Sequence, residues 1–167
     1  MASTGVIGKQ LPMDLLGAGV KNLVPLFSHT REAGKLAAQS IMTTDTVSKE
    51  VAVTMEIGGK TVTLGGMCKG SGMIHPNMCT MLGFLTTDVA ISKELLQKAL
   101  STVVKDTYNM VSVDGDTSTH DTVLLLANGA AGNAEITEEK EDYQTFLDAL
   151  LYVNTCLAKK IAGDGEG

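Results

Sequence analysis

Tryptophan is absent from this chain, only three residues are proline, and aromatic residues make up only 4% of the total. Long apolar runs are missing as well, and none approaches the roughly 18 residues of a membrane-spanning helix. The net charge is −6, and the 13 basic residues form no cluster. Since a phosphate backbone is bound by grouped lysines and arginines, the sequence predicts no nucleic-acid partner, and it predicts no membrane partner either.

Cysteine is also scarce, and the three cysteines, Cys68, Cys79 and Cys156, form no CxxC pair and follow no export signal. Reduced thiols in a cytoplasmic protein are therefore expected. The three histidines form no HExxH pair, and the acidic turn 114–121 does not match an EF-hand loop. Nucleotide motifs before a helix are missing, and residues 70–72 lack the spacing of a GxSxG elbow. We expect no metal and no cofactor.

The chain does contain enough apolar residues for a core, with 44% hydrophobic residues and 18 glycines among its 167 residues. That length fits a single domain, residues 1–167, able to bury about two thirds of its unfolded surface. Interleaved patterns predict an α/β or α+β class. The expected helices cover 13–27, 28–41, 92–106 and 138–161, and the expected strands cover 50–57, 60–67, 80–85, 109–113 and 122–127. The apolar surplus suggests an interface with another chain or with a further segment.

Several local patterns make definite structural predictions. Gly58-Gly59 between two alternating apolar runs predicts a two-residue hairpin turn. The helix of 138–161 has apolar residues at every third or fourth position: Phe146, Leu150, Val153, Leu157 and Ile161. The helix of 28–41 should pack closely through a face of mostly small residues: Ala33, Leu36, Ala37, Ser40 and Ile41. Residues 163–167 should form a polar, mobile tail.

The stretch from Lys69 to Asp88 is the most informative part of the chain. A glycine-rich turn passes through Pro76 into an apolar strand that opens with Thr80. A threonine hydroxyl becomes an effective nucleophile when cleavage places it at a chain N-terminus, because its own α-amine, with a pKa of about 8, then acts as the base. On the residues alone, threonine is common at strand starts, so a structural Thr80 is the simpler interpretation.

A set of motifs favours the nucleophile instead. Asn77-Met-Cys-Thr80-Met-Leu, with Lys69-Gly-Ser-Gly-Met-Ile before it and Thr86-Thr-Asp88 after it, resembles the self-cleavage signature of the ornithine acetyltransferases, also called glutamate N-acetyltransferases. Further segments resemble that family in the family's order: Ser3–Gly8, Leu11–Met13, Ile41–Thr46, Val113–Thr119, Leu124–Gly129 and Gly163–Gly167. The collinear set spans the chain, which is therefore identified as a member of this family and resembles its central part.

The resemblance implies an α/β fold, a layered α-β-β-α sandwich of which this chain holds a part. It implies self-cleavage between Cys79 and Thr80 into chains 1–79 and 80–167, and a heterotetramer of two cleaved pairs. It also implies transfer of acetyl from N-acetylornithine to glutamate in arginine biosynthesis, through an acetyl-threonine and without a metal or cofactor. Acetyl-CoA stays open as a second donor. The alternatives are a self-processing N-terminal-threonine peptidase or amidohydrolase, and a catalytically incomplete segment.

The same resemblance assigns roles to individual positions. Thr80 is the nucleophile, Thr4 and Gly5 match the oxyanion hole, and Thr43, Lys69 and Glu166 join Thr80 in substrate binding. Opposite charges at Lys69 and Glu166 suit the carboxylate and the amine of an amino acid. On the residues alone, Thr43 could simply end a helix, Lys69 could face solvent, and Glu166 could lie in a disordered tail.

Overall fold

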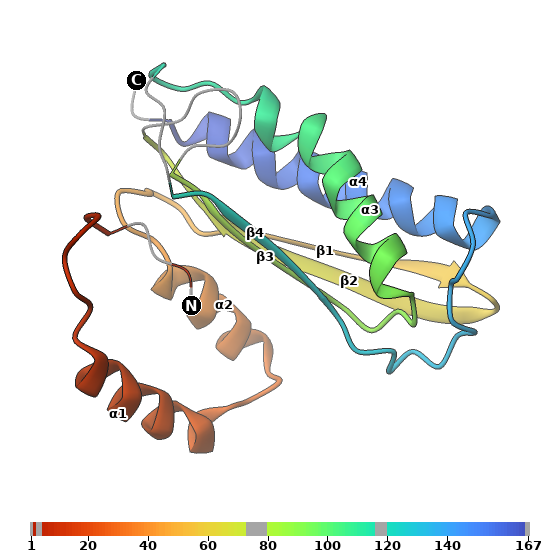
Figure 1. Cartoon of the computed structure of the whole chain (residues 1–167), viewed down its shortest axis with the longest axis horizontal. Coiled ribbons are helices and arrows are strands. Elements are labelled where there is room, and N and C mark those ends of the chain that lie inside the picture. Colours follow the sequence, from red (N-terminus) through yellow and green to blue (C-terminus); the bar gives the residue numbers. More distant parts are fainter. Residues whose placement is uncertain (1, 3–4, 73–79, 116–119, 166–167) are drawn as a thin grey trace.

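The structure is a computed structural model that describes residues 2, 5–72, 80–115 and 120–165 (Figure 1). The strands are β1 (Lys49–Ile57), β2 (Lys60–Lys69), β3 (Leu82–Thr87) and β4 (Thr122–Ala127). The α-helices are α1 (Met13–Leu23), α2 (Arg31–Ser40), α3 (Lys93–Lys105) and α4 (Glu141–Gly163). Two 3-10 turns, η1 (Val24–Leu26) and η2 (Tyr108–Met110), follow α1 and α3.

The strands form a four-stranded sheet in the order β1-β2-β3-β4. β1 and β2 are the predicted hairpin, and its turn residues Gly58 and Gly59 have φ values of 55° and 70°, which glycine adopts freely. β3 adds antiparallel to β2, whereas β4 adds parallel to β3. A parallel neighbour requires a long crossover, and α3 lies within that connection. The α/β class predicted from the sequence is confirmed.

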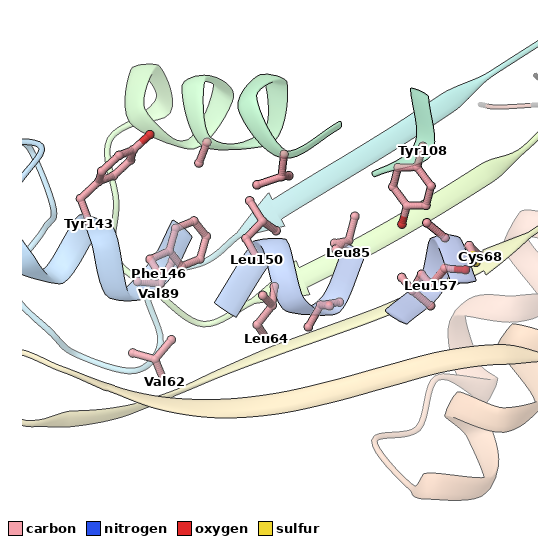
Figure 2. Close-up of a cluster of buried hydrophobic side chains, with 14 of the residues drawn as sticks. Val62, Leu64, Cys68, Leu85, Val89, Tyr108, Tyr143, Phe146, Leu150 and Leu157 are labelled. Carbon is pink, nitrogen blue, oxygen red and sulfur yellow. Dashed lines mark hydrogen bonds between the residues drawn. The ribbon is translucent and has the colours of Figure 1, made fainter. Parts of the chain in front are cut away.

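The core lies between the sheet and the helices α3 and α4, which cover one face together (Figures 1 and 2). The apolar residues predicted as a stripe on the last helix are all buried: Phe146, Leu150, Val153, Leu157 and Ile161. Buried side chains of alternate strand positions, such as Val62, Leu64 and Leu85, belong to the same cluster. α3 begins as predicted, because the Ser92 hydroxyl caps it by accepting the Leu95 N–H at 3.3 Å.

Gly66 marks a close approach of α4 to the sheet. A Cβ atom at this position would lie 3.1 Å from Leu157 Cδ1 and 3.3 Å from Leu85 Cδ2, and both of those residues are fully buried. We expect Gly66→Ala to lower the free energy of unfolding by about 1–3 kcal/mol, since a packed core has no room for an added methyl group. The measurement is unfolding in urea.

The neighbouring residue provides the matched control. Gly65 lies on the opposite face of β2, where a Cβ atom would be 3.9 Å from Ala52 Cβ, an ordinary contact. Gly65→Ala should therefore be tolerated better than Gly66→Ala. If the two variants unfold at the same urea concentration, close packing at Gly66 is not what limits this core.

Two predicted strands differ from the structure. Residues 109–113 do not form a strand, because the chain leaves α3 through η2, where Tyr108 is buried and the Thr107 hydroxyl donates to the Val103 carbonyl at 2.6 Å. The strand predicted at 80–85 begins at Leu82 instead. Thr80 cannot start it, since its φ of 43° lies outside the β region.

The second face of the sheet is only partly covered. α2 lies on this side and contacts β2 (Figure 1). Its predicted packing face is wrong, because Leu36 is 56% exposed and Ala38 is the buried residue. α2 stands off the sheet, and a hollow lined by Gly34 and Ala37 separates them. β4 was predicted to be buried, yet Leu124 and Leu126 are exposed, since only its other face meets the core.

The described residues therefore contain part of a layered sandwich, with helices packed tightly on one face of the sheet and loosely on the other. The short, irregular helix predicted over 13–27 is present as α1 and η1. None of the helices in the described part of the chain is long and apolar enough to cross a membrane.

Candidate functional site

Segments that are distant in sequence meet at one end of the sheet. β2 ends at Lys69, which pairs with Leu82 at the start of β3, and Leu82 pairs with Thr122 at the start of β4. β1 begins at the same end, where Lys49 pairs with Cys68. The loop before β1, the turn after β2 and the residues just before β3 and β4 are therefore neighbours.

Thr43 and Lys69, two of the predicted substrate ligands, are in direct contact. Lys69 Nζ donates to Thr43 Oγ1 at 3.1 Å. Lys69 is 3% exposed, so the alternative of a solvent-facing lysine is wrong. Burial lowers the pKa of Lys69, and Lys49 adds to this effect while Asp45 opposes it. A buried cation beside a hydroxyl is well suited to a carboxylate ligand, whose charge would compensate for the lost hydration.

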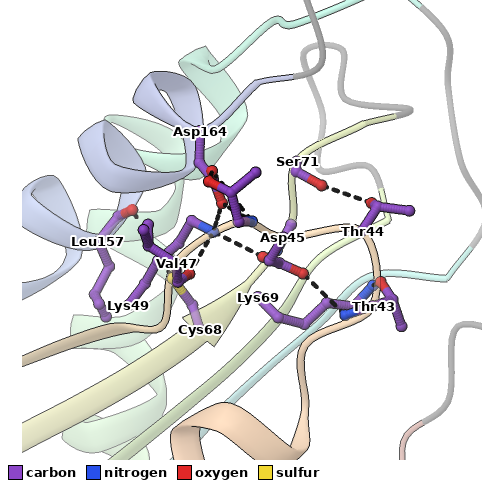
Figure 3. A network of polar contacts seen from close by, with 12 residues as sticks. Thr43, Thr44, Asp45, Val47, Lys49, Cys68, Lys69, Ser71, Leu157 and Asp164 are labelled. Atoms are coloured by element: carbon purple, nitrogen blue, oxygen red, sulfur yellow. Dashed lines mark hydrogen bonds and ion pairs between the residues drawn. The ribbon is translucent and has the colours of Figure 1, made fainter.

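A buried charge cluster, Asp45–Lys49–Asp164, adjoins this pair (Figure 3). Lys49 Nζ lies 2.7 Å from Asp45 Oδ1 and 2.5 Å from Asp164 Oδ2. The side chains of Lys49 and Asp45 are fully buried, and that of Asp164 is 5% exposed. Asp164 also accepts hydrogen bonds from the backbone N–H and the hydroxyl of Thr46. The mobile tail predicted from residue 163 is therefore wrong at Asp164, which fastens the end of α4 to the loop before β1.

Asp45 connects the cluster to the predicted substrate ligands. Its Oδ1 atom accepts the Gly70 N–H at 2.7 Å, and its Oδ2 atom accepts the Thr43 N–H at 3.2 Å. One carboxylate thus holds the residue after Lys69 and the backbone of the Thr43 loop. The position of Lys69 relative to Thr43 follows from these bonds.

The cluster makes stability depend on pH in acid. Burial alone would raise the pKa of Asp164, but hydrogen bonds from Lys49 and Thr46 outweigh it and lower that pKa from 3.8 to about 2. Burial alone would also raise the pKa of Asp45, but hydrogen bonds with Lys49, Gly70 and Thr43 outweigh it and lower that pKa. A carboxyl group whose pKa is lower in the folded state stabilises the protein above its ordinary pKa and loses that contribution as the pH falls through the folded value. We expect stability to decline between about pH 4 and about pH 2.

Urea unfolding at a series of pH values measures this decline. In Lys49→Met the carboxylates lose the partner that lowers their pKa, so their folded-state pKa values move back towards the ordinary value and the decline in acid should become smaller or disappear. Identical acid profiles for the two proteins would contradict the assignment. The pKa of Lys49 is itself raised above 10.5, since bonds with Asp164 and Asp45 outweigh burial, so its contribution persists below that pH and is lost above it.

Thr80 has an unusual backbone and an unusual side-chain environment. Its φ is 43°, a left-handed value that no other non-glycine residue of the described ranges adopts. A β-branched side chain is strained in that region. The Oγ1 atom is buried and has no hydrogen-bond partner among the described residues. Both features cost folding free energy, so stability does not account for this geometry.

Gly5 is the described member of the predicted oxyanion pair. The segment Gly5–Pro12 lines a hollow together with His120, which lies just before β4. The Gly5 segment therefore reaches the end of the sheet at which β3 and β4 begin. Three other predicted site residues, Thr4, Cys79 and Glu166, lie outside the described residues.

Cys68, a buried cysteine at this end of the sheet, is not suited to nucleophilic chemistry. Burial raises the pKa of the Cys68 thiol to about 12, so the thiolate that a nucleophilic cysteine requires is not formed. Within the described ranges, no group of three or more His, Cys, Asp or Glu side chains could hold a metal ion.

Comparison with known proteins assigns the chain to a family. Residues 1–167 match the sequence model of the ArgJ family. The chain belongs to the ArgJ family. The arginine biosynthesis bifunctional protein ArgJ of Symbiobacterium thermophilum is 55% identical over 167 residues, and the ArgJ proteins of Lactococcus lactis and Bacillus subtilis are 52% and 50% identical.

Each of these matches covers 100% of this chain but only 41%, 41% and 40% of the respective ArgJ relative. The chain thus spans about two fifths of the length of the ArgJ proteins that it matches. A crystal structure of ArgJ from Bacillus halodurans is 48% identical, with a TM-score of 0.48 over 50% of this chain and 39% of that one.

The sequence-based prediction missed several polar residues at this end of the sheet: Asp45, Lys49, Asp121 and Asp164. Asp45 and Asp164 lie inside motifs that carry the family resemblance, and this could have singled them out. Lys49 had no comparable signal, because a lysine at a strand start normally faces solvent.

Proposed function

We propose that this chain carries the nucleophile of an acetyltransferase that moves an acetyl group from N-acetylornithine to glutamate in arginine biosynthesis, and that this nucleophile is Thr80. The observation that carries the proposal is Thr80 itself, whose buried hydroxyl and left-handed backbone occur inside the motif that resembles a self-cleavage signature. The name of the relatives, arginine biosynthesis bifunctional protein, supports the pathway.

The reaction sequence begins with cleavage of the Cys79–Thr80 bond. The Thr80 hydroxyl oxygen adds to the carbonyl carbon of residue 79, its proton passes to the Thr80 nitrogen, and the C–N bond breaks to leave an ester. Water hydrolyses the ester, which restores the hydroxyl and leaves chains 1–79 and 80–167. The strained φ of Thr80 supports this step, because loss of the preceding carbonyl carbon removes that constraint.

Acetyl transfer then uses the freed amine as the base. The amine takes the hydroxyl proton while the oxygen attacks the acetyl carbonyl of N-acetylornithine, and ornithine leaves with that proton as the amide bond breaks. The amine of glutamate next attacks the acetyl ester and restores the Thr80 hydroxyl, so the mechanism is ping-pong. Thr4 and Gly5 would donate to the carbonyl oxygen, and one such donor contributes about 3 kcal/mol.

Substrate binding falls to the groups around this nucleophile. The Thr43–Lys69 pair would hold a substrate carboxylate, and Glu166 would hold its amine. The proposed reaction needs no metal or cofactor. Acetyl-CoA is the candidate for a second acetyl donor, which agrees with the word bifunctional in the names of the relatives. The cleaved pairs would assemble as a heterotetramer in the cytoplasm.

The test places this chain in the context of a whole ArgJ protein. The matching 167 residues of the Symbiobacterium thermophilum relative are replaced by this chain, and the hybrid is incubated with N-acetylornithine. We expect one acetyl group on the peptide that begins at Thr80, and we expect glutamate to remove it as N-acetylglutamate. The control is a hybrid that carries Thr46→Ser. This substitution lies away from Thr80 and keeps a hydroxyl that can donate to Asp164.

The outcome also separates the alternatives. Acetyl-Thr80 that is released as acetate at the same rate with or without glutamate indicates a self-processing amidohydrolase or peptidase. A hybrid that cleaves and becomes acetylated, while the 167-residue chain alone cleaves without becoming acetylated, indicates that this segment is catalytically incomplete by itself. A cleaved hybrid with no acetyl on Thr80 contradicts the proposed transfer.

A further inference from the structure

We propose that Asp121 is a positioning residue for the amino end of Thr80, which it orients first as a peptide N–H and, after cleavage, as the α-amine that becomes an ammonium group when it takes the hydroxyl proton. The inference rests on the proposed cleavage before Thr80. Asp121 is not among the site residues predicted from the sequence. It lies just before β4, whereas Thr80 lies just before β3.

The contacts around Met81 carry the inference. Asp121 Oδ1 accepts the Met81 N–H at 3.3 Å, and the neighbouring N–H of Thr80 helps to lower the pKa of the same carboxyl. The next residue, Thr122, donates its N–H to the Met81 carbonyl at 3.2 Å. Two consecutive residues at the start of β4 thus hold Met81, which follows Thr80 and immediately precedes β3. The Thr80 nitrogen, one peptide unit away, therefore lies beside a carboxylate, although a neutral acceptor would suffice for an intact peptide.

The position of this nitrogen decides the geometry of the proposed base. In an N-terminal threonine the nucleophilic Oγ1 and the basic nitrogen belong to one residue, so a group that holds the nitrogen also orients the hydroxyl relative to it. Thr80 Oγ1 is buried and lacks a hydrogen-bond partner among the described residues, so no other described contact aims it. Asp121, held at the next peptide N–H, is the described side chain placed to orient this pair.

The electrostatic surroundings of the Asp121 carboxyl differ between the uncut chain and the chain cleaved before Thr80. Burial raises the pKa of Asp121 more than the N–H groups of Met81 and Thr80 and the charge of His120 lower it. Among the described residues, His120 is the titratable neighbour that acts on this carboxyl. Cleavage converts the neutral Thr80 N–H into an amine that can carry a positive charge close to this carboxyl. The resulting ion pair favours both charged forms, so the amine becomes more basic and the carboxyl more acidic.

The experiment measures the pKa of the Thr80 amine directly, by NMR titration of the cleaved chain made with isotope-labelled threonine. In Asp121→Asn the Oδ1 acceptor and the shape are kept while the charge is removed, and we expect the amine pKa to fall by about 1 pH unit relative to wild type. Asp88→Asn is the matched control, since Asp88 accepts the Thr63 N–H at 2.7 Å away from Thr80. It should leave the amine pKa unchanged.

A second measurement does not require the Asp121 variant to fold or cleave. The carboxyl pKa of Asp121 is compared between the cleaved wild type and the uncut Thr80→Ala chain, and we expect the lower value in the cleaved protein. A wild type that stays uncut overturns the proposed function and this inference together. A cleaved wild type in which Asp121 titrates as it does in the uncut chain overturns the role of Asp121 alone, as does an amine pKa that Asp121→Asn leaves unmoved.

Discussion

Lys49→Met is expected to lower the free energy of unfolding by about 3–5 kcal/mol, since removing one partner of a buried ion pair leaves uncompensated buried charge. Lys49 is the shared partner of Asp45 and Asp164, and each of these side chains is at most 5% exposed. Methionine retains most of the side-chain volume, so the loss reports on charge more than on packing. Urea unfolding at pH 7 measures it.

The chain contains a matched control for this substitution. Lys98 forms an ion pair with Glu139 at 2.5 Å, but the two side chains are 54% and 51% exposed. Because water screens such a pair, Lys98→Met should cost much less than Lys49→Met. Equal losses for the two variants would mean that the Asp45–Lys49–Asp164 cluster contributes no more than a surface contact.

Thr80→Ala is expected to abolish cleavage of the Cys79–Thr80 bond, because no hydroxyl remains to attack the preceding carbonyl. The substitution also removes a buried hydroxyl that lacks a partner among the described residues, so the folded state should not lose stability through a broken hydrogen bond. Intact mass after prolonged incubation measures cleavage, and unfolding in urea measures stability.

Thr80→Ser is the matched control, since it keeps the hydroxyl and removes only the methyl group. Serine relieves the β-branched strain at φ of 43°, so the variant should cleave, but more slowly if strain drives the step. Cleavage of Thr80→Ala at the wild-type rate would show that another group breaks the bond.

Local signals in the sequence were sufficient for much of the fold. The Gly58-Gly59 turn and the helix from Glu141 to Gly163 were predictable, because each depends on residues close together in the chain. The strand predicted at 109–113 was wrong because burial of Tyr108 closes that segment into a 3-10 turn. This outcome depends on core contacts that a short pattern does not contain.

The candidate site was predictable where motifs carried it and not where charges meet across the fold. Thr43, Lys69 and Thr80 were named from motifs, and the structure brings Thr43 into contact with Lys69. The contact between Lys49 and Asp164 joins residues 115 positions apart. It forms only because β1 and the end of α4 meet at the same end of the sheet. Asp121 was missed for the same reason, since its partners lie on another strand connection.

The central claim is that Thr80 is a nucleophile that first acts on its own chain. Intact-mass analysis of the purified wild type, followed over time without any added protease, tests it most directly. The account predicts that the 17.5 kDa chain is replaced by two species, residues 1–79 and residues 80–167, the second beginning at Thr80. A single uncut mass that persists, or cleavage at any other bond, would contradict it.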